Sequence, residues 1–242
     1  MSLGTGLQLR SKKDVSLDSN ASMLFDGTDD VITASGVTTL AGASAFTLSG
    51  WFKKADAGHK LAISYDNSTS NRTSINFHTD SNVFFNLAAG GANYGQFALA
   101  STDWVHLVMV FDGTASGNAN RLKGYFNGVE QTLTYNSTIP AAAHSQSAIF
   151  RIGKDHANSA FSQGSIDEVS VFSSALTARE VDALYNKGRP GNLLQYSTLD
   201  HWYRMGEGTL TGGKRDGDEN LLFDQSTNGG LGSEKITDGG FD

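Results

Sequence analysis

The sequence contains no cysteine and only two prolines. Without cysteine the chain can form no disulfide framework, no zinc site with thiolate ligands and no thiol nucleophile. It also lacks an excess of cationic residues, because the formal net charge is −7. A nucleic-acid partner needs clustered Lys and Arg to meet the phosphate backbone, so we expect no nucleic-acid binding.

Long apolar runs are missing as well. Residues 1–14 contain no apolar stretch of the length that a signal peptide needs, so none is visible. No segment of the chain has the run of about 20 apolar residues that spans a bilayer. We therefore expect no membrane insertion.

Glycine, in contrast, is abundant, with 28 residues, which indicates many short strands joined by glycine turns. Phe46, Leu48 and Phe52 alternate onto one face of a predicted strand and leave Trp51 on the other face. Asn127-Gly128 is a strong hairpin signal between two further strands. The pattern predicts an all-β fold. Other predicted strands cover residues 23–25, 60–65, 74–78, 83–87, 104–111 and 150–153.

One helix interrupts this pattern. Thr177 and Glu180 have the spacing of a capping box, and Val181, Leu184 and Tyr185 form an apolar stripe at helical spacing. Gly188, two residues before Pro190, predicts the end of the helix.

Five segments occur in an order that identifies a family: 24–31, 46–52, 104–108, 125–129 and 166–169 with the helix that follows. Together they resemble the laminin-G-like jelly rolls of the concanavalin A-like lectin/glucanase superfamily. The resemblance implies a two-sheet antiparallel jelly-roll sandwich over residues 21–190, with the short helix after the last core strand. Residues 1–20 would form an N-terminal arm or edge strand, and residues 191–242 a C-terminal tail or the start of a further β unit.

Asp167 and Glu168 are a candidate acid pair on the last core strand. A glycosidase needs two carboxyl groups about 5–9.5 Å apart, but adjacent strand residues point to opposite faces. The Glu-x-Asp-x-x-Glu pattern of the jelly-roll glucanases is absent, since Ser165 stands two residues before Asp167. His106 lies among apolar residues, where a core histidine is expected rather than a base. We expect no catalytic residues and no enzyme.

Asp26, Asp29 and Asp30 cluster around a glycine turn, and hard oxygen ligands on a tight turn suit calcium. Spacing alone favours the simpler interpretation, in which these aspartates accept hydrogen bonds from turn amides. Asp167 shares a predicted face with two valines, so it would need backbone amides, a cation or calcium as compensation. We hypothesise one structural calcium held by the Asp26–Asp30 turn, with Asp167 as a further candidate ligand.

A sugar site needs an aromatic platform beside amide or hydroxyl groups. We favour Asn93, Tyr94 and Gln96 as ligand-binding residues, because Gly90-Gly91 leaves that loop open to an approaching ligand. Trp51 and Trp104 lie in apolar segments and are expected to pack in the core or on a sheet face.

The resemblance implies a non-catalytic recognition or adhesion module in a surface or virion protein, with a glycan or another cell-surface ligand as its partner. Its location would be extracellular, at the cell surface or on a virion. A purely structural component of a virion or surface assembly, which could oligomerise, is the alternative. A divergent glycoside hydrolase is a third hypothesis, which two facing acids in the concave cleft would support.

Overall fold

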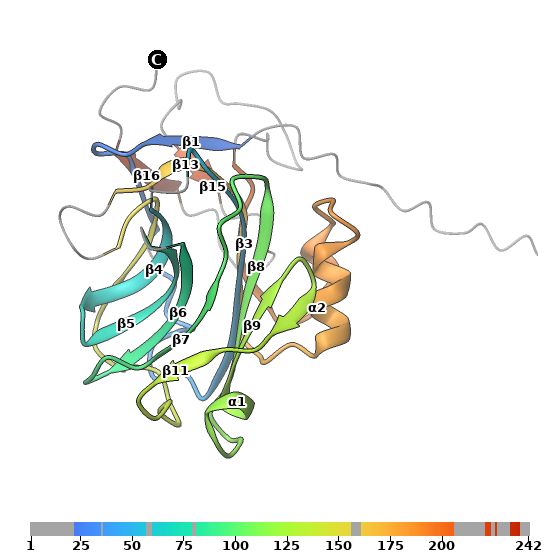
Figure 1. The fold of residues 1–242 in the computed structure, drawn as a ribbon. Helices are drawn as coiled ribbons and strands as arrows, with labels where there is room; N and C mark the ends of the chain where they lie inside the picture. Colours follow the sequence, from blue (N-terminus) through green and yellow to red (C-terminus); the bar gives the residue numbers. More distant parts are fainter. Residues whose placement is uncertain are drawn as a thin grey trace, which may run out of the picture.

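The computed structural model describes residues 22–34, 36–56, 60–78, 81–155, 161–205, 221–223, 226 and 233–237. These residues form two antiparallel sheets packed face to face, as Figure 1 shows. The all-β jelly-roll sandwich expected from the sequence is therefore confirmed.

The first sheet has seven strands in the order β1-β13-β3-β8-β9-β10, with β14 also paired to β13. Its strands are β1 (Met23–Asp26), β3 (Ala45–Lys54), β8 (Val105–Asp112), β9 (Leu122–Phe126), β10 (Val129–Gln131), β13 (Gln163–Phe172) and β14 (Leu199–Tyr203).

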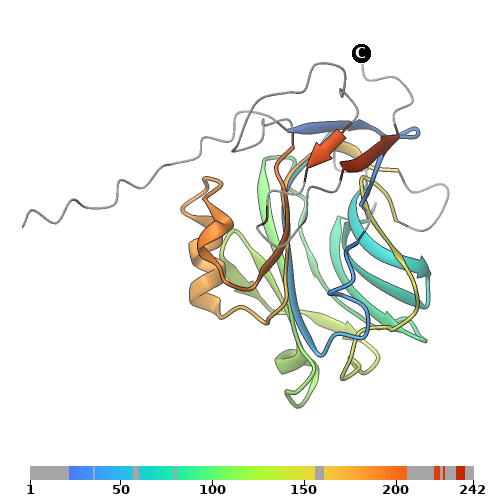
Figure 2. The same cartoon turned by 180° about the vertical axis from the view of Figure 1, so that it is seen from behind.

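The second sheet has nine strands in the order β11-β7-β6-β5-β4-β12-β2-β16-β15. Its strands are β2 (Val31–Ala34), β4 (Leu61–Ser68), β5 (Asn71–Phe77), β6 (Asn82–Ala89), β7 (Tyr94–Ala98), β11 (Thr134–Asn136), β12 (Ile149–Ile152), β15 (Leu221–Phe223) and β16 (Ser233–Thr237). Seen from behind in Figure 2, β15 and β16 lie at the end of the sandwich that β1 crosses.

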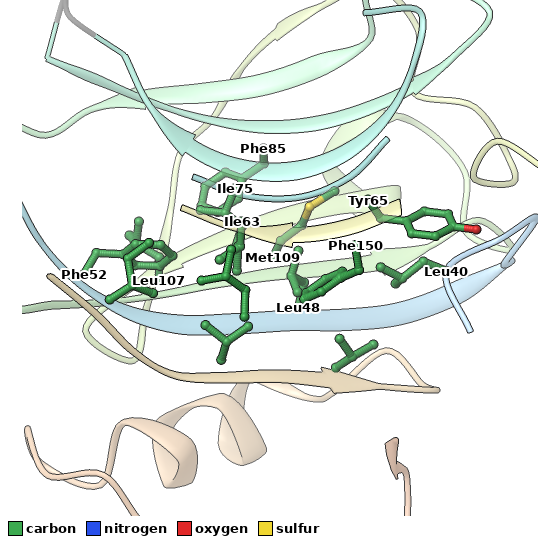
Figure 3. Close-up of a cluster of buried hydrophobic side chains, with 14 of the residues drawn as sticks. Leu40, Leu48, Phe52, Ile63, Tyr65, Ile75, Phe85, Leu107, Met109 and Phe150 are labelled. Atoms are coloured by element: carbon green, nitrogen blue, oxygen red, sulfur yellow. The ribbon is translucent and has the colours of Figure 1, made fainter. Parts of the chain in front are cut away.

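The main core fills the space between the two sheets. It consists of alternate residues of the facing strands, because successive side chains of a strand point to opposite faces. Figure 3 shows Phe85 and Ile75 of the second sheet against Leu107, Met109 and Leu48 of the first. Phe46, Leu48 and Phe52 belong to this core and Trp51 does not, as the alternation predicts.

A second apolar cluster covers the outer face of the first sheet. Helix α2 (Ala178–Tyr185) lies there (Figure 1), with Val181 and Leu184 buried against Trp202 and Tyr125. The predicted capping box is present, since Thr177 and Glu180 exchange hydrogen bonds. The helix ends earlier than predicted, because Asn186 adopts the left-handed conformation that closes the last turn.

One predicted hairpin turn and two short helical segments connect further strands. Asn127 and Gly128 both have positive φ, 49° and 81°, which is the backbone that a two-residue hairpin between β9 and β10 requires. A second short helix, α1 (Asn118–Arg121), was not predicted in the Gly/Asn loop that follows β8. A 3₁₀ turn, η1 (Leu193–Gln195), follows α2 and precedes β14.

Trp104 is a correction to the sequence interpretation. Its side chain is 37% exposed and lies one residue before β8, so it is neither in the core nor within a strand. The apolar run that includes it begins to be buried only at Val105.

No helix in the described part of the chain is long and apolar enough to cross a membrane.

Candidate binding site

The outer face of the second sheet carries a polar surface. In β5, Thr73, Ile75 and Phe77 are buried on the inner side, which directs Arg72, Ser74 and Asn76 outward. In β6, Val83, Phe85 and Leu87 belong to the core, so Phe84 and Asn86 face outward in the same way. Strand register places Asn76 beside Phe84 and Ser74 beside Asn86.

A pocket of about 220 Å³ opens on this face. Its floor comes from β5 and β6, one wall from Tyr94 of β7, and the opposite side from residues next to β4 and β12. The lining residues are Lys60, Arg72, Asn76, His78, Phe84, Asn86, Tyr94 and Asp155. Five separate segments of the chain therefore converge on one small hollow.

Asn86 organises the floor of the pocket. Its side chain is 2% exposed, and its amide nitrogen donates to Asn76 Oδ1 at 2.6 Å and to Ser74 Oγ at 3.1 Å. Its amide oxygen accepts from Arg72 Nη2 at 3.0 Å. Because the Asn76 oxygen is occupied in this way, the two N–H groups of Asn76 are the part of that side chain left to meet a ligand.

Three aromatic rings form a row along the pocket. The ring of Phe84 lies 5.0 Å from that of Tyr94 and 5.4 Å from that of His78, measured between centroids. All three residues line the pocket, and all three are at least partly exposed. Such a row offers apolar ring faces beside polar groups, which is the arrangement that a sugar ring requires.

The charged groups of the pocket are mainly cationic. Arg72 Nη1 lies 3.6 Å from Asp155 Oδ2, and its Nε is buried without a hydrogen-bond partner. Lys60 adds a second cation, and Asp155 is the one carboxylate among the described lining residues. Next to the pocket, the fully buried carboxylate of Asp66 is neutralised by Arg151 at 2.5 Å.

The three predicted ligand-binding residues occupy different positions. Tyr94 lines the pocket. Gln96 lies opposite Phe84 in the strand register, hence on the same face, but outside the lining. Asn93 donates to the carbonyl oxygen of Thr138 at 2.7 Å, which commits its amide to fixing the loop. The other lining residues were missed, although the outward alternation of Arg72, Ser74 and Asn76 is visible in the sequence.

The predicted metal ligands separate into two groups. One carboxylate oxygen of each of Asp26, Asp29 and Asp30 lies within 4.8 Å of the others. Asp26 accepts from the Thr28 amide at 2.7 Å, and Asp30 accepts from the Asp26 amide at 2.8 Å. The Thr28 amide holds the pKa of Asp26 below its usual value. Carboxylate oxygens that converge in this way are the ligands that a hard cation prefers.

Asp167 does not belong to that cluster. Its carboxylate accepts from the backbone amides of Glu168 at 2.7 Å and Met205 at 3.1 Å. Of the compensations that the sequence allowed for this buried carboxylate, the structure provides backbone amides.

The prediction that Asp167 and Glu168 point to opposite faces is wrong. A β-bulge interrupts the pairing of β13 with β3 at these residues, and Glu168 has a positive φ of 51°. Ile166 and Val169, three apart, both belong to the inner core. Glu168 bonds Trp202 on the outer side, and Asp167 lies opposite the outward-facing Trp51 in the register. The extra residue of the bulge puts both acids on the outer face.

Glu168 is held there by two donors, Trp202 Nε1 and Arg204 Nε, the latter at 3.1 Å. Burial and the neighbouring Asp167 nevertheless raise its pKa to about 7. Nearby His106 accepts or donates a hydrogen bond with Ser49 at 2.9 Å, and burial lowers its pKa to about 3. Helix α2 and the turn after it cover these groups, leaving a space of only about 10 Å³.

Two face-to-face antiparallel sheets define a β sandwich, and a polar pocket lies on one of its outer faces. The family model for the concanavalin A-like lectin/glucanases superfamily matches residues 26–182. The chain belongs to this laminin-G-like family, as the order of its sequence motifs implied.

Solved structures share this fold at low identity. One is a protein of Bacteroides ovatus, provisionally described as carbohydrate-binding, with 15% identity and a TM-score of 0.61, and the match covers 92% of this chain and 59% of that one. Another is NanB in complex with Optactamide, with 18% identity and a TM-score of 0.51, over 67% of this chain and 27% of that one. This chain thus spans less than two thirds of either protein. No curated protein matches it.

Proposed function

We propose that the protein is a non-catalytic recognition module that binds a glycan in the pocket on the outer face of its nine-stranded sheet. The observation that carries the proposal is the row of His78, Phe84 and Tyr94 beside the hydrogen-bonded floor of Asn76 and Asn86. Aromatic faces stack on the apolar side of a sugar, and a preorganised amide floor selects its hydroxyl groups.

The chemistry of the pocket supports binding rather than hydrolysis. A glycosidase needs two carboxyl groups on either side of the scissile bond, and among the described lining residues Asp155 alone carries one. The buried acids Asp167 and Glu168 lie on the first sheet beneath α2, away from this pocket. The family and the carbohydrate-binding description of the Bacteroides ovatus protein agree with a binding role. The location that we propose for this role is the cell surface or the outside of the cell.

The test is glycan binding by the wild-type protein and by Tyr94→Ala, measured on a glycan array and then by calorimetry. We expect loss of one aromatic face to weaken binding by about five- to tenfold, since a stacking contact on an aromatic ring contributes on the order of 1–1.5 kcal/mol. Tyr135→Phe serves as control, because that tyrosine lies on β11 and its hydroxyl donates to Leu122 within the fold. An array without any bound glycan would overturn the proposal and favour a structural assembly role. Full binding by Tyr94→Ala would overturn the assignment of the binding site to this pocket.

We also propose one structural calcium ion at the turn between β1 and β2, with Asp26, Asp29 and Asp30 as its ligands. The convergence of three carboxylates on a tight turn supports it. Asp167 is not part of this proposal, because backbone amides already occupy its carboxylate.

A further inference from the structure

The pocket that we propose as the glycan site has an unusual balance of charge for this protein. The chain as a whole carries a formal charge of −7, yet two full cations, Lys60 and Arg72, line the pocket against the single carboxylate of Asp155. A local excess of positive charge in an acidic protein marks a place where an anion is favoured.

Arg72 is fixed in position but only partly neutralised. Its Nη2 is held by Asn86 at 3.0 Å, while the nearest approach to Asp155, from Nη1, is a loose 3.6 Å. A guanidinium has five N–H donors in a planar fork, so this contact leaves capacity for a second anion. The Asn86 bond holds the group in place, which lowers the entropy cost of binding.

Lys60 has no hydrogen-bond or ion-pair partner for its ammonium group within the described part of the chain. It precedes β4 and lines the pocket together with His78 and Asp155. Folding gains nothing from placing an unpaired cation in a hollow, whereas an anionic ligand would gain a charge-assisted hydrogen bond there.

The remaining free polar groups point to the same kind of ligand. Asn76 presents its N–H groups because its oxygen is bonded to Asn86, and N–H groups can only donate. With the two cations, the pocket therefore offers mostly donors, which match an acceptor-rich anion better than a neutral hydroxyl pattern. The aromatic row at the other side restricts the ligand to one with a ring face to stack.

We infer that the pocket recognises an acidic sugar, in which a carboxylate or sulfate group meets Lys60 and Arg72 while the sugar ring packs on Tyr94 and Phe84. This inference rests on the proposed glycan-binding function and specifies the class of glycan. The volume of about 220 Å³, below the roughly 300–1,000 Å³ of a pocket for a drug-sized ligand, fits a single terminal or side-branch residue.

The experiment is an array of uronate-containing, sulfated and neutral oligosaccharides, probed with wild type, Lys60→Gln and Lys53→Gln. Lys53 is an exposed lysine on β3 of the other sheet and does not line the pocket, so its variant removes the same charge outside the pocket. We expect the acidic sugars to bind more tightly than matched neutral ones. Lys60→Gln should lose about tenfold in affinity for them, with binding of neutral sugars unchanged and Lys53→Gln equal to wild type. The uronate and sulfate arms then identify which anion is bound.

Salt provides an independent readout, because screening weakens the contact of an anionic sugar with Lys60 and Arg72. Wild-type affinity for the acidic sugar should fall between 50 and about 500 mM salt, and less so in Lys60→Gln. The outcomes separate the two proposals. If neutral sugars bind best, Tyr94→Ala abolishes binding and Lys60→Gln has no effect, the glycan site stands and the acidic ligand is overturned. An array without any bound glycan overturns both.

Discussion

At the scale of single residues, Glu168 shows how position changes the chemistry of a side chain. Its carboxylate is buried beneath α2 and bonded to Trp202 and Arg204. Desolvation and the neighbouring Asp167 raise its pKa from the usual 4.5 to about 7. Between pH 4.5 and 7 the folded protein therefore holds a proton on Glu168, whereas the unfolded chain has released it. The stability that this proton contributes is lost as the pH rises from 4.5 through 7.

We expect Glu168→Gln to remove this dependence. Relative to wild type, the variant should gain roughly 3 kcal/mol in free energy of unfolding between pH 4.5 and 8, since one pKa unit corresponds to about 1.4 kcal/mol. Urea denaturation at several pH values measures it.

The difference between variant and wild type is the quantity to follow. His106, with its pKa lowered to about 3, contributes the opposite slope below pH 6.5, and that contribution cancels in the difference. Asp103→Asn, at an exposed loop position, is the control. Parallel stability curves for wild type and Glu168→Gln would contradict the prediction.

At the scale of elements, β13 explains why the acid pair is where it is. Residues 163–166 of β13 pair with β1, and residues 169–172 pair with β14. The bulge at Asp167 and Glu168 lies between these two partners, and the Met205 amide at the end of β14 bonds Asp167. The two acids therefore tie β14 and the residues that follow it to β13.

The turn between β1 and β2 carries the calcium prediction. Asp29 is the residue to change, because Asp26 and Asp30 also accept turn amides, so their loss would alter the turn itself. We expect calcium to raise the thermal midpoint of the wild type, EDTA to reverse the rise, and Asp29→Asn to reduce the response. Thermal shift and calorimetric titration measure these effects, with Asp103→Asn as control. An unchanged midpoint in calcium and EDTA would mean that the three aspartates only cap the turn.

At the scale of the whole molecule, the segment after α2 completes the sandwich. Strand β14 pairs with β13, Trp202 is fully buried in the outer cluster, and Tyr203 and Met205 reach the inner core. Strand β16 pairs with β2 at the other sheet. These contacts link residues near the C-terminal end to strands from the first half of the chain.

Replacing Trp202 tests how much this segment stabilises the fold. We expect Trp202→Ala to lower the free energy of unfolding by about 3–5 kcal/mol, because it empties a buried site and removes one of the two donors to Glu168. Trp104→Ala, at a 37% exposed position, should cost under about 1 kcal/mol. Denaturation followed by circular dichroism compares them. Equal, small losses in both variants would show that the segment is dispensable.

Much of the fold follows from local sequence patterns. The capping box of Thr177 and Glu180, the Asn127-Gly128 turn and the alternation around Trp51 each act within a few residues, so each could be predicted. The order of the motifs identified the family, since that order reflects the succession of strands. The burial of Trp104 was predicted wrongly, because burial depends on which other segments pack over a side chain. The end of α2 was predicted too late, because Asn186 adopts the left-handed conformation before Gly188 is reached.

The sequence by itself determined the β-sandwich class, the helix after the last core strand and the family, because strand alternation, turns and caps are local. The binding pocket and the placement of the acid pair were decided only by tertiary structure. Lys60, Arg72, Phe84, Tyr94 and Asp155 come from separate segments and meet only after the strands pair in register. The bulge at Asp167 and Glu168 arises where β13 changes partners, and strand alternation alone cannot reveal it.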